Sequence, residues 1–189
     1  CGYGGRFCTW MMKNDTEPYG SFGNGSAMRV SPVAWFAGSL DECEKLAAAT
    51  AEVTHDHPEG IKGAVVVAGA IYLARTGRSM AEIREYTERF YPIDFSLDEI
   101  RPDYDFVETC QGSVPQALEA FFESTGFEDA IRNAVSIGGD SDTIADMAGA
   151  IAEAYYGADP EMKSIALSYL DQDLLDIAEE FERRIILKA

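Results

Sequence analysis

The spacing of apolar residues predicts helices along most of the chain. Over residues 59–76, apolar side chains recur every three or four positions, which is typical of a buried helical face. This segment is expected to be the central helix. The same spacing predicts helices over 6–13, 28–36, 39–54, 79–90, 113–124, 127–135, 142–156, 159–170 and 171–187, with a short turn near 97. No pair of strands is predicted. We therefore expect an all-α fold, compact and irregular rather than a four-helix bundle.

Capping residues support several of these boundaries. Ser79 followed by Glu82 forms the sequence pattern of a capping box, and Ser39 is a candidate N-cap. Gly77 is placed to end the helix predicted over 59–76. Pro115 is expected in the first turn of the helix over 113–124, where a missing N–H costs little.

Length and composition favour one globular domain over residues 1–189. The 189 residues can bury a sizeable core, and the chain shows no repeat or linker. The most apolar stretch, 63–74, is too short to cross a membrane, and no signal peptide opens the chain. We therefore expect no membrane partner.

The charge balance excludes one class of partner. With 33 acidic residues against 15 Lys and Arg, the net charge is −18, whereas nucleic-acid binding needs basic residues to contact phosphates. No nucleic-acid partner is expected. An anionic ligand would face the same repulsion, unless a bound cation or helix N-terminal amides offset it locally.

The four cysteines, Cys1, Cys8, Cys43 and Cys110, match no zinc-binding spacing. Their density is too low for a secreted disulfide scaffold, so we interpret them as reduced thiols of a cytoplasmic protein. A Cys1–Cys8 loop is conceivable but has no support in the sequence. The chain begins without Met, which leaves open whether Cys1 is its natural terminus.

The densest candidate site lies in residues 137–145. Asp140 and Asp142 stand two positions apart, with Thr143 next, directly after Gly138-Gly139 and at the start of a predicted helix. Such hard oxygen ligands suit Mg²⁺. An ordinary helix cap within a turn would show a similar pattern. A cap needs one acceptor, however, and a second carboxylate beside it adds repulsion unless a cation offsets the charge.

A second candidate is the long segment 14–26, which lacks helical periodicity. Glycines alternate with aromatic and hydroxyl residues in Gly20-Ser21-Phe22-Gly23-Asn24, a composition that fits a backbone wrapped around a ligand. A flexible segment is the alternative. Arg29, between Met28 and Val30, would need a counter-ion if buried, so a structural pairing with an acidic residue is favoured for it.

The two histidines, His55 and His57, interrupt two predicted helices. The His-x-His spacing suggests zinc, but no Cys or further His completes a ligand set, so we discount that metal. A polar break between helices is the alternative for both residues and is favoured for His57. A second Asp-x-Asp pair, Asp171 and Asp173, is interpreted as helix capping.

Three segments together carry a family resemblance. Gly138 to Ala145, Tyr19 to Val30, and Thr54 to Gly60 resemble, in order, the metal motif, the ADP-ribose-binding segment and the Thr-His segment of the ADP-ribosylglycohydrolase family. The dinitrogenase-reductase-activating glycohydrolase is a member of that family. Three motifs in the family's order are much more specific than any one of them.

The resemblance implies an activity and a set of roles. For this chain it implies release of ADP-ribose from a modified side chain, with arginine favoured, by cleavage of the N- or O-glycosidic bond at a site with two Mg²⁺ ions. Asp140 and Asp142 would be catalytic and, with Thr143, would bind metal. The ligand would be ADP-ribose or an ADP-ribosylated protein, and its contacts would come from Gly20, Ser21, Phe22, Gly23, Asn24 and His55.

The family's opposing metal ligands, an acidic residue near its first helix and a Thr-Asp-Asp segment, have no counterpart here. Asp15-Thr16-Glu17 has similar letters in the wrong order and place. The chain thus resembles the later part of the family domain, with half the metal ligands. We expect self-association or a complementary segment to complete it. Activity of the chain alone stays open; the alternatives are a non-catalytic ADP-ribose-binding or structural relative, and a hydrolase of another phosphorylated small molecule.

Overall fold

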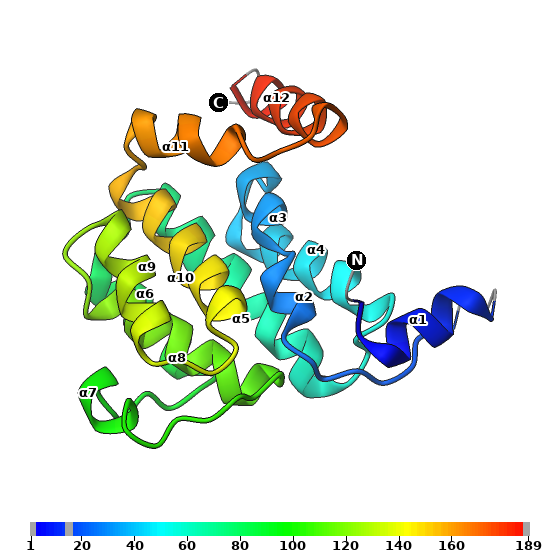
Figure 1. Ribbon diagram of the computed structural model, residues 1–189, viewed down its shortest axis with the longest axis horizontal. Helices are drawn as coiled ribbons and strands as arrows, with labels where there is room; N and C mark the ends of the chain where they lie inside the picture. Colours follow the sequence, from blue (N-terminus) through cyan, green and yellow to red (C-terminus); the bar gives the residue numbers. More distant parts are fainter. Residues whose placement is uncertain (1–2, 14–16, 187–189) are drawn as a thin grey trace.

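The computed structural model describes residues 3–13 and 17–186 (Figure 1). The described part of the chain consists of helices and the loops between them and contains no β-strand, only an isolated antiparallel bridge between Gly23 and Thr109. The expectation of an all-α fold is therefore confirmed. The helices are α1 Gly5–Met12, α2 Gly25–Met28, α3 Ser31–Phe36, α4 Leu40–Glu52, α5 Pro58–Arg75, α6 Met80–Glu88, α7 Leu97–Ile100, α8 Cys110–Phe122, α9 Phe127–Ser136, α10 Ser141–Tyr156, α11 Pro160–Leu167 and α12 Gln172–Ile186.

Helix α5 is the centre of the packing, as its apolar periodicity predicts. It contacts α2, α3, α4, α6, α8 and α10. Its buried positions are mostly small or β-branched, which lets several helices approach it closely; they are Gly60, Gly63, Ala64, Val66, Val67, Ala68, Gly69, Ala70, Ile71 and Ala74. Because α5 is covered on several sides, its N-terminal end is held firmly, and the candidate site lies at that end.

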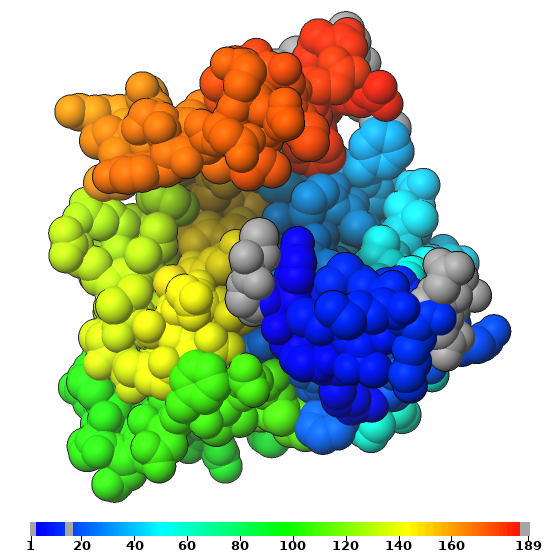
Figure 2. Space-filling model, turned by 45° about the vertical axis from the view of Figure 1, so that its right-hand side comes forward, coloured from blue at the N-terminus to red at the C-terminus, as the bar shows by residue number. Residues whose placement is uncertain are grey.

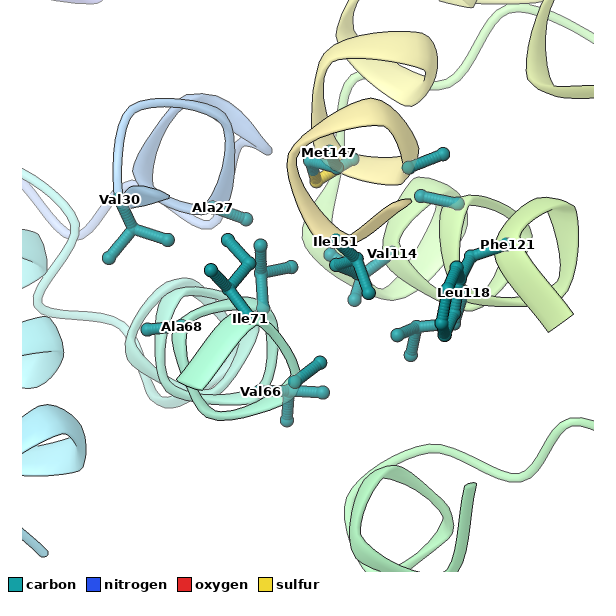
Figure 3. Close-up of a cluster of buried hydrophobic side chains, with 14 of the residues drawn as sticks. Ala27, Val30, Val66, Ala68, Ile71, Val114, Leu118, Phe121, Met147 and Ile151 are labelled. Atoms are coloured by element: carbon teal, nitrogen blue, oxygen red, sulfur yellow. The ribbon is translucent and has the colours of Figure 1, made fainter. Parts of the chain in front are cut away.

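The hydrophobic core joins α5 to α8 and α10. Figure 3 shows Ile71 of α5, Val114 and Leu118 of α8, and Met147 and Ile151 of α10 converging on one region. All five side chains are fully buried. Burial of each such side chain contributes about 1.5–3 kcal/mol relative to exposure, so this contact sets the relative positions of the three helices.

Helices α11 and α12 form a pair at one end of the molecule, above α3 and α10 in Figure 1. In the space-filling view they stand out as a ridge along that end (Figure 2). An ion pair between Lys163 and Glu182 connects them. Several apolar side chains stay exposed here, including Ile165 of α11, Ile177 of α12 and Tyr169 between the two helices. The pair follows α10 directly in the chain and contributes none of the candidate site residues.

Two helix predictions are wrong in their boundaries near proline. The helix predicted over 28–36 is split into α2 and α3, with a break at Arg29 and Val30. Pro32 explains the break, because its ring would clash with the carbonyl of Met28 in a continuous helix. Helix α8 begins at Cys110 rather than at residue 113, so Pro115 lies inside the helix and not in its first turn.

Other local predictions are confirmed. Ser79 and Glu82 form the complete capping box of α6, and the Ser39 hydroxyl accepts a hydrogen bond from the Glu42 amide at the start of α4. The Asp171 carboxylate accepts one from the Leu174 amide at 3.0 Å, which fits the capping interpretation. Helix α11 ends at Leu167, earlier than predicted.

Among the described residues, none of the helices combines the length and the apolar content that a membrane span requires. Cys8, Cys43 and Cys110 are free thiols. Cys1, and therefore the conceivable Cys1–Cys8 loop, lies outside the described residues, as do Asp15 and Thr16.

Candidate functional site

The glycine-rich segment before α2 is anchored on the connection between α4 and α5. The Gly20 amide donates a hydrogen bond of 2.6 Å to Asp56 Oδ1, and the Ser21 amide donates to the Thr54 carbonyl at 3.3 Å. Ser21 Oγ in turn accepts from the Gly23 amide at 3.3 Å. The amides of Gly20 and Gly23, which the sequence suggests as ligand contacts, therefore have partners within the protein.

The same segment is joined on its other side to the residues that precede α8. The backbone N–H of Asn24 donates to the Glu108 carbonyl at 2.8 Å, and the backbone N–H of Cys110 donates to the Phe22 carbonyl at 3.0 Å. Gly23 and Thr109 form the antiparallel bridge between the two segments. This pairing explains why α8 begins as early as Cys110. It also means that the loop is a fixed element rather than a flexible segment.

Gly60, in the first turn of α5, permits this assembly. A Cβ at this position would lie 2.6 Å from the Ser21 carbonyl oxygen and 3.0 Å from His55 Cβ. Both distances are shorter than ordinary contacts between nonbonded atoms. Since the nearest atom belongs to backbone, it could not move aside cheaply. The absence of a side chain at Gly60 therefore lets the loop and the His55 segment lie against the start of α5.

The Asn24 side chain connects the glycine-rich loop to the acidic motif. Its Nδ2 donates to Asp140 Oδ2 at 2.6 Å and to Ser113 Oγ at 3.2 Å. Asn24, Ser113 and Asp140 are all buried, with exposed fractions of 8% or less. The structure thus brings together two of the sequence-predicted segments, and it adds Ser113 of α8 as a third participant. In Figure 1 the start of α2 and the N-terminal end of α10 lie at the same end of the helix layer.

The acidic motif forms the entrance of α10. Gly138 and Gly139 adopt positive φ angles of 75° and 65°, and Asp140 occupies the N-cap position. A Cβ at Gly139 would lie 2.5 Å from the Tyr104 ring. Position 139 therefore requires glycine for two reasons: the positive φ angle of its backbone and the close approach of the Tyr104 ring. The sequence-level description of this segment as a glycine turn before a helix is confirmed.

The two carboxylates of the motif lie close enough to repel each other. Burial raises the pKa of Asp140, and the neighbouring Asp142 carboxylate raises this pKa further, whereas hydrogen bonds from Asn24 and Thr143 lower it. Thr143 is buried, while Asp142 is exposed. The Asp140 carboxylate is thus held by hydrogen bonds, whereas the Asp142 carboxylate is accessible to solvent. Repulsion of this kind is relieved by a bound cation, so the donor set fits a hard divalent metal.

Two further residues lie in the field of these carboxylates. Asp146, one helical turn after Asp142, keeps an exposed side chain, but partial loss of solvation around its carboxyl and the charge on Asp142 raise its pKa to about 6. Burial raises the pKa of Tyr104 to about 12, with a contribution from Asp140. Sequence reasoning missed both. The spacing of four between Asp142 and Asp146 could have indicated a shared helix face, whereas nothing in the sequence around Tyr104 indicates its proximity.

His55 lies beside the glycine-rich loop. Its Nδ1 is 2.8 Å from Thr54 Oγ1, and a Cβ at Gly23 would lie 3.7 Å from its Nε2. Burial and the charges of Arg29 and Arg6 lower the pKa of His55 to about 4, so the ring is neutral at pH 7.

His57 has a different position from His55. It is the N-cap of α5, and its Nδ1 accepts a hydrogen bond from the Glu59 amide at 3.1 Å. The Phe22 ring packs against it, with the ring centroids 5.1 Å apart, and Phe22 is itself 38% exposed. These contacts agree with the interpretation of His57 as a polar break between helices.

Arg29 differs from its predicted role. The expected acidic partner is absent among the described residues: Arg29 Nη2 donates to the Thr50 carbonyl and to Thr54 Oγ1, each at 3.1 Å. Arg29 is also exposed, so it needs no buried counter-ion. The prediction fails because the break between α2 and α3 turns this side chain toward the end of α4.

Comparisons with known proteins agree with this geometry. A model of the ADP-ribosylglycohydrolase family matches residues 3–187. ADP-ribosylhydrolase ARH3 of Homo sapiens is 30% identical over an alignment of 217 positions, which covers 90% of this chain and 60% of that protein. The ADP-ribosyl-(dinitrogen reductase) glycohydrolase of Rhodospirillum rubrum is 30% identical, with 90% and 58% covered.

Two further relatives add to this comparison. ADP-ribosylarginine hydrolase Tri1 of Pseudomonas putida is 31% identical, with 85% of this chain and 47% of that protein covered. A solved structure described as an ADP-ribosylglycohydrolase-related protein complex superimposes with a TM-score of 0.68 and 26% identity, covering 94% of this chain and 64% of that one. The chain spans at most about 60% of the length of the three curated relatives.

Proposed function

This chain belongs to the ADP-ribosylglycohydrolase family, and on that basis we propose that it hydrolyses ADP-ribosyl bonds, releasing ADP-ribose from an ADP-ribosylated protein. Several relatives are named as hydrolases of such substrates. The observation that carries the proposal is the hydrogen bond of 2.6 Å between Asn24 and Asp140. It places the candidate ligand loop next to the candidate metal residues, as an enzyme acting on a ribose must do.

The glycine-rich loop would receive the diphosphate and the distal ribose. Its own backbone is held by Asp56 and Glu108, so it needs little ordering when a ligand binds. Phe22 is partly exposed and can pack on a sugar or a base. The neutral His55 ring lies beside the loop and can contact phosphate oxygens.

Asp140, Asp142 and Thr143 would hold Mg²⁺, since their oxygens are hard ligands and their carboxylates repel each other without a cation. Bound Mg²⁺ would supply Lewis acidity at the ribose that is cleaved. Asn24 and Ser113 would keep the Asp140 carboxylate oriented. Arginine is the modified side chain that we favour, because one relative is named as an ADP-ribosylarginine hydrolase.

The second candidate function is ADP-ribose binding without catalysis. Asp140, Asp142 and Thr143 offer three side chains, whereas Mg²⁺ requires six ligands. Within the described residues, no group of three or more His, Cys, Asp and Glu side chains is placed to hold a metal. Water, substrate, a second copy of the chain or a complementary segment would have to complete the coordination. A chain that lacks such completion would keep the ligand loop and lose the chemistry.

The deciding experiment measures ADP-ribose release from a protein modified on arginine, with and without Mg²⁺. Asp142→Ala removes one proposed ligand, and Asp173→Ala is the matched control, because Asp173 belongs to the other Asp-x-Asp pair. Mg²⁺-dependent release that Asp142→Ala abolishes and Asp173→Ala retains supports the hydrolase. No release, together with ADP-ribose binding that survives Asp142→Ala, supports the binding protein.

Two extensions separate the remaining possibilities. Specific activity that rises with protein concentration would indicate that a second copy completes the site. Displacement of bound ADP-ribose by a different phosphorylated compound at lower concentration would indicate a hydrolase of another small molecule, and it would contradict the proposal.

A further inference from the structure

Three polar side chains form a chain of contacts that ends beside the glycine-rich loop. Arg29 Nη2 lies 3.1 Å from Thr54 Oγ1, and the same oxygen lies 2.8 Å from His55 Nδ1. Thr54 and His55 are buried, with exposed fractions of 3% and 7%. Arg29 is held in place by a second hydrogen bond, to the Thr50 carbonyl at 3.1 Å. The three residues come from the end of α2, the residues after α4, and the approach to α5.

The directions of these hydrogen bonds follow from counting protons. An arginine can only donate, so the Thr54 oxygen must accept from Arg29. The Thr54 hydroxyl has one proton, and among the described residues its remaining partner is His55 Nδ1. If Nδ1 carried the proton of the neutral ring, the buried hydroxyl proton would have no acceptor, which is costly. Nδ1 therefore accepts, and Nε2 carries the ring proton.

The Nε2 edge of the ring faces the loop that we assign to the ligand. A Cβ built on Gly23 or on Gly25 would lie 3.7 Å from His55 Nε2. None of the described residues accepts a hydrogen bond from this nitrogen. The donor is thus left available on the side of the loop.

We propose that Arg29 is a positioning residue, which acts through Thr54 to hold His55 as the Nε2–H tautomer, so that the ring donates a hydrogen bond to an anionic oxygen of the ligand. The opposite tautomer would present a lone pair to that oxygen and would repel it. The nature of the ligand rests on the function proposed above, whereas the tautomer is a property of the ligand-free protein. Arg29 therefore has a role beyond the structural pairing that its sequence context suggests.

Nitrogen-15 NMR of the histidine rings tests the tautomer directly. The chain has only His55 and His57, so two pairs of ring-nitrogen signals are expected, and His57→Gln assigns each pair. In the unmodified protein at pH 7, His55 Nε2 should show the shift of a protonated ring nitrogen and Nδ1 that of an unprotonated one. The reverse pattern would overturn the proposal, whatever the protein binds.

Variants test the contribution of each member of the chain. Arg29→Gln and Thr54→Val should turn the His55 signals into those of a tautomer mixture, while Arg29→Lys and Thr54→Ser should retain the Nε2–H form. Arg78→Gln is the matched control, because Arg78 is also an exposed arginine but pairs with Glu82, away from Thr54 and His55. An Arg29→Gln variant that folds and keeps the tautomer would remove Arg29 from the proposal. If that variant does not fold, Arg29→Lys and Thr54→Val test the proposal instead: Arg29→Lys should retain the Nε2–H tautomer, and Thr54→Val should lose it.

ADP-ribose titration of the same variants separates the tautomer from the proposed function. We expect Arg29→Gln and Thr54→Val to weaken ADP-ribose binding about tenfold or more. Each variant disturbs the single hydrogen bond that His55 Nε2 donates to a charged oxygen of the ligand. Unchanged affinity in a variant whose tautomer has changed would refute the donor role of His55. A Nε2–H ring in a protein that does not bind ADP-ribose would leave the tautomer assignment standing and would refute the proposed function instead.

Discussion

Asn24 Nδ2 lies 2.6 Å from Asp140 Oδ2, although the two residues are 116 positions apart in the chain. The contact is buried, and it crosses from the loop before α2 to the entrance of α10. One amide thereby orients the carboxylate that the metal motif contributes and fixes the loop that precedes α2. This hydrogen bond therefore links the two parts of the proposed site, the loop before α2 and the acidic motif at the start of α10.

Removing the Asn24 amide is expected to destabilise the fold. Asn24→Ala deprives the buried Asp140 carboxylate of a donor, and hydrogen bonds to charged groups contribute about 1.5–3 kcal/mol. Asn24→Asp should cost more in metal-free buffer, because it adds a carboxylate next to Asp140. Urea denaturation at pH 7 measures both. Asn133→Ala is the control, since its bond of 3.3 Å goes to a neutral carbonyl. An Asn24→Asp variant as stable as the original protein would contradict the geometry.

Mg²⁺ is expected to stabilise the protein through the acidic motif. At a concentration tenfold above its Kd, a ligand specific for the folded state adds about 1.4 kcal/mol to the free energy of unfolding. Asp142→Asn should remove this gain. In metal-free buffer the same variant should be at least as stable as the original, because it relieves repulsion with Asp140. Thermal unfolding with and without Mg²⁺ measures both effects.

The matched control for the Mg²⁺ experiment is Asp173→Asn, in the first turn of α12. This variant should respond to Mg²⁺ like the unmodified protein. An equal loss of the Mg²⁺ effect in Asp142→Asn and Asp173→Asn would show that the ion screens the net charge of −18 rather than binding at α10.

The pKa of Asp146 predicts a pH dependence of stability in the absence of metal. The folded-state pKa is raised from 3.8 to about 6, so between these values the folded state binds more protons than the unfolded state. The stabilising contribution of this group is complete below pH 3.8 and is lost as the pH rises through 6. Asp146→Asn should remove that loss and raise the urea midpoint at pH 7 relative to the unmodified protein, by a small amount because solvent screens this exposed carboxylate.

The ionisation of His55 should change stability with pH in the opposite direction from that of Asp146, over an overlapping pH range. The reason is that its folded-state pKa is lowered from 6.5 to about 4. Its contribution is present above pH 6.5 and is lost as the pH falls toward 4. The measurement is therefore a comparison of urea midpoints from pH 4 to 8 for the original protein, Asp146→Asn and His55→Gln. Profiles with the same slope in all three proteins would contradict both pKa shifts.

Gly60→Ala should disturb the site from within α5. The added Cβ would lie 2.6 Å from the Ser21 carbonyl, and overpacking of this kind costs about 1–3 kcal/mol. Because the displaced atoms belong to the ligand loop, ADP-ribose affinity should fall as well. Differential scanning calorimetry and ligand titration measure the two effects.

Gly149→Ala provides the control for this change. It also adds a Cβ to a helix, but the nearest atoms are side-chain atoms of Ile131, Cγ1 at 3.3 Å and Cδ1 at 3.5 Å. The higher helix propensity of alanine offsets that contact, so stability should change by less than about 1 kcal/mol. Equal destabilisation by the two substitutions would show that Gly60 has no special relation to the loop.

Local features were largely predictable from the sequence, because their causes lie within one or two helical turns. The periodicity of α5, the capping box of Ser79 and Glu82, and the glycine turn before α10 all appear in the structure. Boundaries failed where distant residues intervened. Helix α8 begins at Cys110 because that amide bonds to the Phe22 carbonyl, a partner that no local pattern indicates.

The sequence by itself determined that the chain is all-α, which segment is central, and which short motifs carry oxygen ligands and glycines. Only the tertiary structure decided that Asn24 meets Asp140, that the amides of Gly20 and Gly23 already have internal partners, and that Arg29 reaches Thr54 rather than an acid. The reason is physical. Helix formation and capping depend on neighbours in the chain, whereas these contacts depend on how α5 packs with α2, α8 and α10.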